Sequence, residues 1–581
     1  MSMTPEADSK RRRTTRLRIA LLAAVSVLAG ATGFAYVLGQ PGLAGVLRHD
    51  VTALPGWRWE QSGPLQLGST GVVFDPTAVG RQISPLIYGV AAADQATLRA
   101  LGATLDRSGG DPTSTYNWVN GHAWNAGRDW QFRNVNYGQS ASADDGVAAT
   151  LAARATPLLT VPTMGWVARN DDNDTRSVGV PASGGPALRG GQGAIAGYNP
   201  SANRSAVFVP SAAGAPGPAP DPSDPGAPVV YQDQWVRHLA ARFGIGPGGV
   251  QLFTMDNEPD LWSSIHTDAH PARMGYDDML ANFVEYATAV KAQAPAALVL
   301  GPDVSGWTSY LYSDLDRGAD NFRTHQDRRN HGDDAFLPWW LGQVHAHDQA
   351  TGTRTLDYLD VHYYPQEPGV ALGKAGDDAT RELRIRSTRS LWDPYYGDES
   401  WIGTPVSLIP RLRAWIDQRY PGTRLAITEY RWGGEDDASG AVALAEVLGI
   451  FGRQGVDLAS YWTHPPVGSP AGAAFRLYRN YDGSGATFGD VSLPVTATPD
   501  GVAAFASRHS DTGEVNVVIA NESLSATATV PLTGFSAGDY TAARYCIPAG
   551  TGRIVRQDMP GAGSPVPMPP LTVCLVRLQP R

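Results

Sequence analysis

The stretch "VQLFTMDNEPDLW", residues 250–262, decides the fold because it joins an apolar run to a set of polar side chains. Residues 250–255 are mostly apolar and are followed at once by turn-forming residues, which is typical of a strand buried in a parallel sheet. Asp256, Asn257 and Glu258 then lie just past the end of that strand. In α/β proteins this is where loops carry the chemistry.

Seven further runs resemble this one, and most of them are followed by a helix-like segment. They are residues 85–90, 103–107, 157–161, 298–301, 358–364, 424–428 and 458–462. The helix-like segments with the clearest apolar spacing are residues 230–244, 279–293, 336–347, 407–420 and 441–455. Eight alternating units with continuous apolar strands predict an α/β fold, a (β/α)8 TIM-type barrel over residues 85–466.

Two long segments interrupt the minimal barrel, residues 108–142 and residues 165–229. Both follow predicted barrel strands, so we expect the first to form a wall of a substrate groove. The second ends in "VPSAAGAPGPAPDPSDPGAP", residues 209–228, whose prolines disfavour regular structure. We interpret this tract as a surface loop that is exposed to solvent.

Beyond the barrel, residues 467–581 show short strand-like pieces separated by turn residues, which predicts a smaller C-terminal β-sandwich domain. The pieces are residues 473–483, 502–511, 515–523, 526–532, 540–547 and 571–579. Strands within residues 71–84 are expected to join this domain. Its two cysteines, Cys546 and Cys574, could form a disulfide or remain buried thiols.

The N-terminus has the pattern of an exported protein. Residues 1–18 carry six basic side chains, and residues 19–38 carry no charge, which is long enough for a transmembrane helix. We expect an uncleaved anchor with a cytoplasmic basic segment, and a tether over residues 39–70. A signal sequence that is removed after export is the alternative.

The charge of the remaining chain excludes one class of partner. Residues 19–581 carry 40 basic and 54 acidic side chains, a net charge of about −14. A negative body binds polyanions poorly, so we expect no nucleic-acid partner, whereas neutral or cationic polymers remain candidates.

Two glutamates stand at the ends of predicted barrel strands. Glu258 follows the fourth strand, and Glu429 lies in "LAITEYRWGG" at the end of the seventh. These strands are on roughly opposite sides of an eight-stranded ring, so their carboxylates can face each other across a bound sugar. Retaining glycosidases need two carboxylates about 5–5.5 Å apart.

Several motifs, in order along residues 83–466, resemble the endoglucanases of glycoside hydrolase family 44. They are "YNW", "TMDNEPDLW", "HTDAHP", "GPDVSGW", "DVHYYP" and "ITEYRWGG". The resemblance implies a barrel with a β-sandwich and retaining attack on β-1,4-linked glucans. It also implies that Glu258 is the acid/base and Glu429 the nucleophile.

The residues beside this pair have plausible roles of their own. Asn257 can hydrogen-bond the 2-hydroxyl of the sugar at the cleavage point, an interaction that strengthens in the transition state. Either Tyr363 or Tyr364 can hold Glu429 through its hydroxyl, with the other ring in the barrel wall. Arg107 can support Glu429 through charge, although a purely structural ion pair is an equal interpretation.

Tryptophans near the strand ends are candidates for stacking on sugar rings, although many aromatic rings are ordinary core residues. The candidates are Trp118, Trp307, Trp432 and Trp462, of which Trp307 and Trp432 follow strand ends directly. The sequence departs from the pattern "RWGGN" expected of the family, because it reads "RSGGD" with Ser108 and Asp111. That change affects the groove wall beside Arg107.

Other functions are kept as alternatives. The pair His345 and His347 suggests a metal-dependent hydrolase, but residues two apart on a helix point to different sides. The chain could also be an inactive glycan-binding protein, or act on xyloglucan, xylan, mannan or a bacterial exopolysaccharide. We expect a monomer that needs no cofactor, and a structural calcium ion held by loop acids is compatible with the family.

Overall fold

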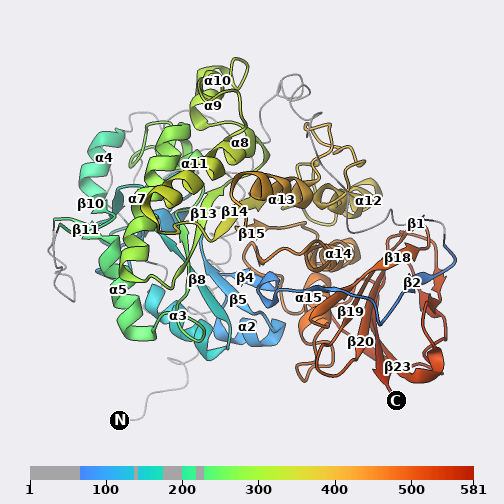
Figure 1. The fold of residues 1–581 in the computed structure, drawn as a ribbon. Coiled ribbons are helices and arrows are strands. Elements are labelled where there is room, and N and C mark those ends of the chain that lie inside the picture. The colour runs from blue at the N-terminus through green and yellow to red at the C-terminus, as the bar shows by residue number, and fades with distance from the viewer. Residues whose placement is uncertain (1–65, 68, 137–141, 174–198, 217–227) are drawn as a thin grey trace, which may run out of the picture.

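A computed structural model describes residues 66–67, 69–136, 142–173, 199–216 and 228–581 (Figure 1). The predicted basic segment, the predicted membrane anchor over residues 19–38 and most of the predicted tether lie outside these ranges. Among the helices within the ranges, none is both long enough and apolar enough to cross a membrane.

Eight parallel strands close into a barrel, as the alternating pattern predicted. Their order around the ring is β12, β13, β14, β15, β16, β4, β5, β8, so β8 returns to pair with β12. The strands are β4 (Gly89–Ala91), β5 (Leu105–Ser108), β8 (Thr156–Val161), β12 (Leu252–Met255), β13 (Leu298–Val304), β14 (Tyr358–Tyr363), β15 (Arg424–Tyr430) and β16 (Leu458–Tyr461). Each predicted strand overlaps one of them in sequence.

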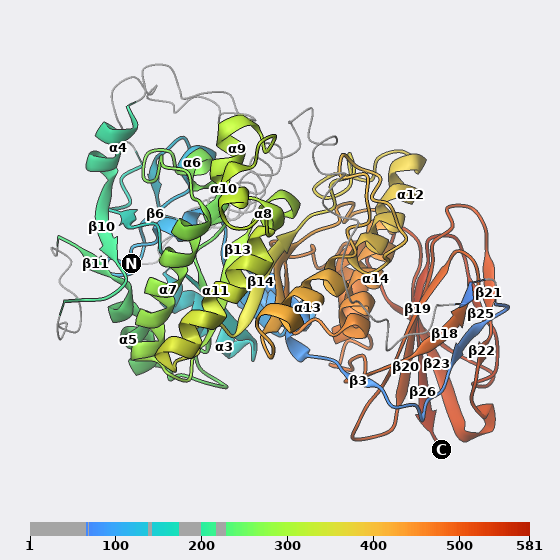
Figure 2. The same cartoon turned by 45° about the horizontal axis from the view of Figure 1, so that its top comes forward.

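Helices surround the barrel strands (Figures 1 and 2). The longer ones are α3 (Ala143–Ala152), α5 (Gln232–Phe243), α7 (Tyr276–Gln293), α11 (Phe336–Thr351), α13 (Leu408–Arg419), α14 (Ala438–Gln454) and α15 (Pro470–Arg479). The shorter ones are α2 (Gln95–Leu101), α4 (Pro200–Val207), α6 (Trp262–Ile265), α8 (Trp307–Leu311), α9 (Asp314–Asp320), α10 (Gln326–Asn330) and α12 (Asp378–Arg386). The five predicted helices are confirmed as α5, α7, α11, α13 and α14.

Helix α14 is buried along most of its length, which explains its unusual composition. It contacts strands β17 (Val491–Leu493), β19 (Val502–Arg508), β20 (Val515–Asn521) and β26 (Val573–Pro580) of the C-terminal domain. The close approach needs Gly449, where an added Cβ would lie 2.3 Å from the ring of Phe505. A helix that is apolar on all sides is stable only when it is enclosed in this way.

Two predicted strands are wrong in part. Residues 473–483 were expected to be a strand, but most of them belong to α15, because Ser469 caps the helix and Pro470 occupies its first turn. The spacing of Ala471, Ala474, Phe475 and Tyr478 places these buried side chains on one helical face. In the run 85–90, residues 85–87 form a short 3-10 helix and the strand starts at Gly89.

The long loops are partly structured. The first contains η4 (Asp111–Thr115), β6 (Trp124–Asn125), η5 (Gly127–Trp130) and β7 (Asn134–Val135). The second contains β9 (Trp166–Ala168), α4, β10 (Phe208–Ala212) and β11 (Val230–Tyr231). The expectation that residues 209–228 lack regular structure is therefore wrong at its start. Strand β10 includes Pro210, since proline removes only its own N–H from a ladder.

The C-terminal domain is rich in β-structure. Its seven-stranded sheet has the order β24-β23-β26-β20-β19-β17-β3, and a four-stranded sheet has the order β1-β18-β2-β22. The strands not yet given are β1 (Gln66–Leu67), β2 (Val72–Phe74), β3 (Arg81–Gln82), β18 (Val495–Thr498), β21 (Ala528–Val530), β22 (Leu532–Thr533), β23 (Tyr540–Ile547), β24 (Val555–Asp558) and β25 (Val566–Met568).

Side chains from both sheets share one apolar cluster, separate from that of the barrel. Val72 and Phe74 on β2 meet Val517 on β20 and Val576 on β26 there. A disulfide joins Cys546 on β23 to Cys574 on β26 within this cluster, which resolves the two interpretations of the cysteines.

Candidate active site

The barrel interior changes from apolar to polar along the strands. Seven strands each contribute one side chain to an apolar layer: Leu105, Leu158, Leu252, Leu300, Tyr358, Ala426 and Leu458. Because side chains alternate with a period of two, the next inward positions on four of these strands are Arg107, Thr254, Asp360 and Thr428. A buried polar layer therefore lies between the apolar layer and the mouth of the barrel.

Hydrogen bonds from two threonines to Asp360 link the polar layer. Thr428 donates to Asp360 Oδ1 at 2.7 Å, and Thr254 Oγ1 lies 3.3 Å from Asp360 Oδ2. Burial, with the nearby charge of Asp303, raises the pKa of Asp360 to about 8. Because the Asp360 carboxyl group is then mostly neutral at pH 7, the barrel interior below the mouth carries less negative charge than its acidic residues suggest.

The chain leaves β12 in an unusual conformation that presents Glu258. Asp256 and Glu258 have φ angles of 66° and 45°, in the left-handed region that costs a non-glycine residue roughly 1–2 kcal/mol. Hydrogen bonds hold the turn, with Asp256 Oδ1 accepting from the N–H of Asn257 and Asp303 O accepting from the N–H of Glu258. Backbone strain of this kind is found at functional sites.

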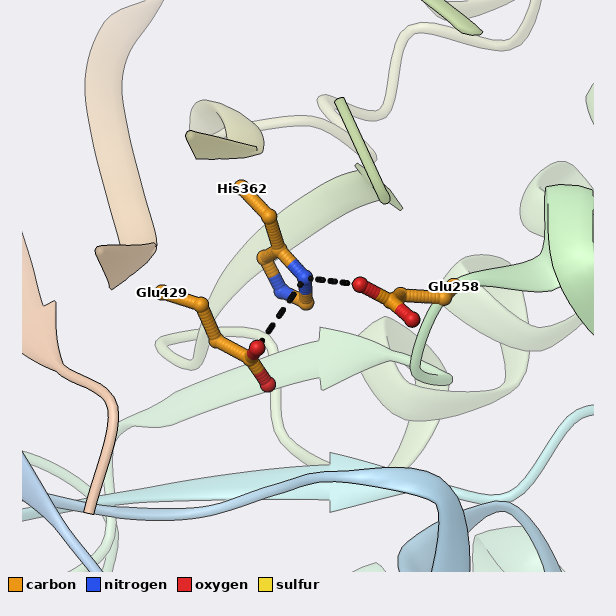
Figure 3. A group of neighbouring side chains, drawn as sticks. All are labelled: Glu258, His362 and Glu429. Atoms are coloured by element: carbon orange, nitrogen blue, oxygen red, sulfur yellow. Dashed lines mark hydrogen bonds and ion pairs between the residues drawn. The ribbon is translucent and has the colours of Figure 1, made fainter. Parts of the chain in front are cut away.

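Glu258 and Glu429 face each other through His362 (Figure 3). The ring Nδ1 of His362 lies 2.8 Å from Glu258 Oε1 and 3.5 Å from Glu429 Oε2. One oxygen of each glutamate and the His362 nitrogen all lie within 4.8 Å of one another. The expected meeting of the two glutamates therefore occurs, with a histidine between them.

Both ring nitrogens of His362 face carboxylates, since Nε2 contacts Asp303 on β13. Burial alone would lower the pKa of His362, but the charges of Glu429 and Asp303 outweigh it and hold the pKa well above its ordinary value. The ring is therefore a cation that donates from both nitrogens.

Glu258 has the protonation expected of an acid catalyst. Burial raises its pKa to about 7, and the charge of Glu429 adds to the shift, although His362 opposes it through a hydrogen bond and its charge. A carboxyl group with a pKa near 7 can give and take a proton at neutral pH.

Glu429 is held by two donors. Arg107, fully buried on β5, donates from Nη1 to Glu429 Oε1 at 2.6 Å, and Tyr364 donates from its hydroxyl to Oε2 at 2.7 Å. Arg107 also contacts Asp303 Oδ2 at 3.1 Å. The two interpretations of Arg107 thus coexist, because one guanidinium both supports Glu429 and forms a buried ion pair.

Asn257 joins the site to the first long loop. Its Oδ1 accepts hydrogen bonds from Arg107 Nη2 and from the N–H of Gly110, both at 3.0 Å. Gly110 has a φ of 92°, and a Cβ there would lie 2.6 Å from the ring of Trp462. The loop that was expected to wall the groove therefore packs directly against the site.

Among the remaining candidate residues, Trp462 packs in one cluster with Tyr364, the tyrosine that donates to Glu429. Tyr363 is the ring that points away, toward Trp432 at 5.9 Å between ring centroids. Trp307 and Trp432 are only 3% and 2% exposed, so they pack in the core and present no ring to a sugar. Trp118 is also in that core, and its indole donates to Tyr231 O.

Sequence reasoning missed His362 and Asp303 as functional residues. Both residues entered only as letters of family motifs, His362 in "DVHYYP" and Asp303 in "GPDVSGW". The alternation in β14 was the available signal, because it puts Asp360 and His362 on one face.

The group Glu258, His362 and Glu429 is, within the described ranges, the one set of three side chains spaced to hold a metal ion. Its histidine offers no lone pair in the protonation state derived above, because both nitrogens carry protons directed at carboxylates. His345, in contrast, lies on α11, with Nδ1 2.9 Å from Arg419 O. The protonation of His362 and the backbone contact of His345 do not favour the metal-dependent alternative.

Known proteins resemble the chain over most of its length. The sequence profile of glycoside hydrolase family 44 matches residues 123–367. The structure of CelM2, a bifunctional glucanase-xylanase from a metagenome library, is 35% identical, with a TM-score of 0.75. The match covers 89% of this chain and all of that one. A Paenibacillus polymyxa xyloglucanase of family 44 is 28% identical, with a TM-score of 0.74, over 87% of this chain and 99% of that one.

A curated relative is also similar in sequence. Endoglucanase A of Paenibacillus lautus is 32% identical over 457 residues, or 76% of this chain. The match spans 62% of that relative's length. With the profile and the two structures, these similarities show that the chain belongs to glycoside hydrolase family 44.

Proposed function

We propose that the protein is a retaining glycoside hydrolase that cleaves β-1,4-linked glucan-type polysaccharides through Glu258 and Glu429. The observation that carries the proposal is the approach of the two carboxylates, one oxygen of each lying within 4.8 Å of the other. Retaining enzymes place these groups about 5–5.5 Å apart, whereas inverting enzymes leave about 6.5–9.5 Å for a water molecule.

The first step forms a covalent intermediate. A Glu429 oxygen attacks the anomeric carbon while the bond to the leaving oxygen breaks, and Glu258 transfers its proton to that oxygen. Arg107 and Tyr364 orient the attacking carboxylate. Asn257 stands beside the acid, where its amide can bind the 2-hydroxyl of the sugar.

The second step restores the enzyme. Glu258, now a carboxylate, takes a proton from water, and the resulting hydroxide attacks the anomeric carbon and displaces Glu429. The cationic His362 stabilises Glu258 while it is ionised between the two steps, through the 2.8 Å hydrogen bond.

Several observations bear on the substrate. CelM2 is described as a glucanase-xylanase and the P. polymyxa relative as a xyloglucanase. A β-linked glucan backbone is the feature that endoglucanases and xyloglucanases share, so we favour it over xylan, mannan or an exopolysaccharide. The presence of both glutamates argues against a binding protein without activity.

We also propose that the barrel acts outside the cytoplasm, held at the membrane by residues 19–38. The basic segment before this uncharged run supports that orientation. Active enzyme in the washed membrane fraction is the expected result, and enzyme found entirely in the medium contradicts the anchor.

The test of the activity is reducing-sugar release from soluble β-glucan, xyloglucan, xylan and mannan. Wild-type protein is expected to act on a glucan backbone, and Glu258→Gln and Glu429→Gln to lose at least about 10³-fold in rate. Glu382→Gln, a change at an exposed glutamate on α12, is the matched control. Activity retained by both site variants contradicts the mechanism, and an inactive wild-type protein that binds glycans supports the binding alternative.

A further inference from the structure

Asp111, at the start of η4, lies in the wall of the site and has no role in the mechanism described so far. Its side chain is buried, and its Oδ1 accepts from Asn257 Nδ2 at 3.3 Å. It therefore contacts the one neutral side chain that stands beside the proposed acid.

The hydrogen bonds of Asn257 fix the orientation of its amide. The two groups that approach Oδ1, the guanidinium of Arg107 and the N–H of Gly110, can only donate hydrogen bonds. The amide oxygen must therefore face them, and Nδ2 must face Asp111. An amide turned by 180° would bring N–H groups against two donors.

Asp111 must therefore accept the hydrogen bond from Asn257 Nδ2, and its surroundings allow this. A second buried aspartate, Asp129 on η5, is hydrogen-bonded to it. Burial and then the charge of Glu258 raise the pKa of Asp111 well above its ordinary value. Two such carboxyl groups can share one proton, which leaves an Asp111 oxygen free to accept from Asn257.

We propose that Asp111 is a positioning residue, which holds the Asn257 amide so that its second Nδ2–H is directed to the sugar's 2-hydroxyl. This inference rests on the proposed function, since it assigns a purpose to Asn257 in glycoside cleavage. Asp111 itself does not touch the reacting atoms. Its effect on the reaction passes through one hydrogen bond.

The experiment compares Asp111→Ala with Asp111→Asn on two substrates. One is an aryl β-cellotetraoside, and the other is the same glycoside without the 2-hydroxyl on the ring that bears the aryl group. We expect D111A to lower kcat about tenfold on the first substrate, with KM little changed. On the second, D111A and wild type should agree within roughly twofold, because the contact that Asp111 supports is absent.

The conservative variant and a control separate positioning from general damage. D111N keeps an oxygen for Asn257 and should remain within roughly threefold of wild type on both substrates. Asp106→Ala removes a carboxyl group on β5, outside the site, that accepts hydrogen bonds from the N–H of Ala93 and the hydroxyl of Thr150. This variant should change kcat by the same factor on both substrates. Equal losses on both substrates for D111A, or a D111N variant as slow as D111A, overturn the inference.

A second measurement does not depend on turnover. With ¹⁵N-labelled asparagine, the Nδ2 hydrogens of Asn257 should exchange with solvent faster in D111A than in wild type or D111N. Equal exchange in all three proteins overturns the positioning role. If wild type does not cleave the parent glycoside, the proposed function fails, while the exchange data still decide whether Asp111 fixes the amide.

Discussion

His362 donates from Nδ1 to Oε1 of Glu258 at 2.8 Å, although 104 positions separate the two residues in the chain. The same nitrogen lies 3.5 Å from Glu429, so one buried cation serves both carboxylates. Closure of the barrel creates this relationship, because β12, β14 and β15 bring their ends to one mouth.

The pH dependence of the wild-type enzyme should reflect Glu258. Its pKa of about 7 means that the acid form, which the first step needs, is lost as the pH rises through that value. We expect kcat/KM on a soluble glucan to fall above about pH 7. A profile that stays flat to pH 9 would show that Glu258 is not the proton donor.

Replacing His362 should change the pH at which kcat/KM falls. His362→Asn removes the positive charge that lowers the pKa of Glu258, so the fall in kcat/KM should shift to higher pH. We also expect kcat to fall by roughly 10–100-fold, because a charge-assisted hydrogen bond is lost. His345→Asn on α11 is the control. If kcat/KM falls at the same pH in H362N as in wild type, His362 does not lower the pKa of Glu258.

Two neighbouring tyrosines at the end of β14, Tyr363 and Tyr364, provide a matched pair. Tyr364→Phe removes the hydroxyl that donates to Glu429 Oε2 and should lower kcat by roughly 10–100-fold. Tyr363→Phe removes a hydroxyl on the ring that packs toward Trp432, so kcat should change little. Comparing kcat for the two variants checks the assignment, which fails if Y363F is the slower enzyme.

The disulfide should affect stability and leave catalysis intact. Cys546 and Cys574 close a segment of 28 residues in the C-terminal domain. Changing both to alanine should reduce the free energy of unfolding by about 2–4 kcal/mol, measured by denaturant titration. The kcat at 25 °C should match wild type, since the bond joins β23 to β26 and the glutamates lie in the barrel. A large loss of kcat would show coupling between the domains.

The barrel could be predicted because its signal is local. Each apolar run is long enough for one strand, and turn residues mark its ends. The failure at α15 arose because Ser469 and Pro470, which begin the helix, lie just before the predicted strand at residues 473–483. Packing against α14 and α2 then stabilises the helix.

The site could be predicted only where a residue carries its own motif. Glu258 and Glu429 could be found from their motifs. The role of His362, in contrast, depends on contacts with side chains from other strands. The burial of Trp307 and Trp432 likewise depends on residues distant in the chain, since Arg411 lies over the Trp307 ring and Trp432 donates to Ser387. Spacing along the chain holds no information about such coverage.

The central claim is that Glu429 forms a covalent intermediate and Glu258 completes its hydrolysis. The most direct measurement is ¹H NMR of the anomeric proton at the new reducing end, recorded before mutarotation. The account predicts that the β-anomer appears first and the α-anomer only later. Initial release of the α-anomer would contradict it, because a single displacement by water inverts the anomeric carbon.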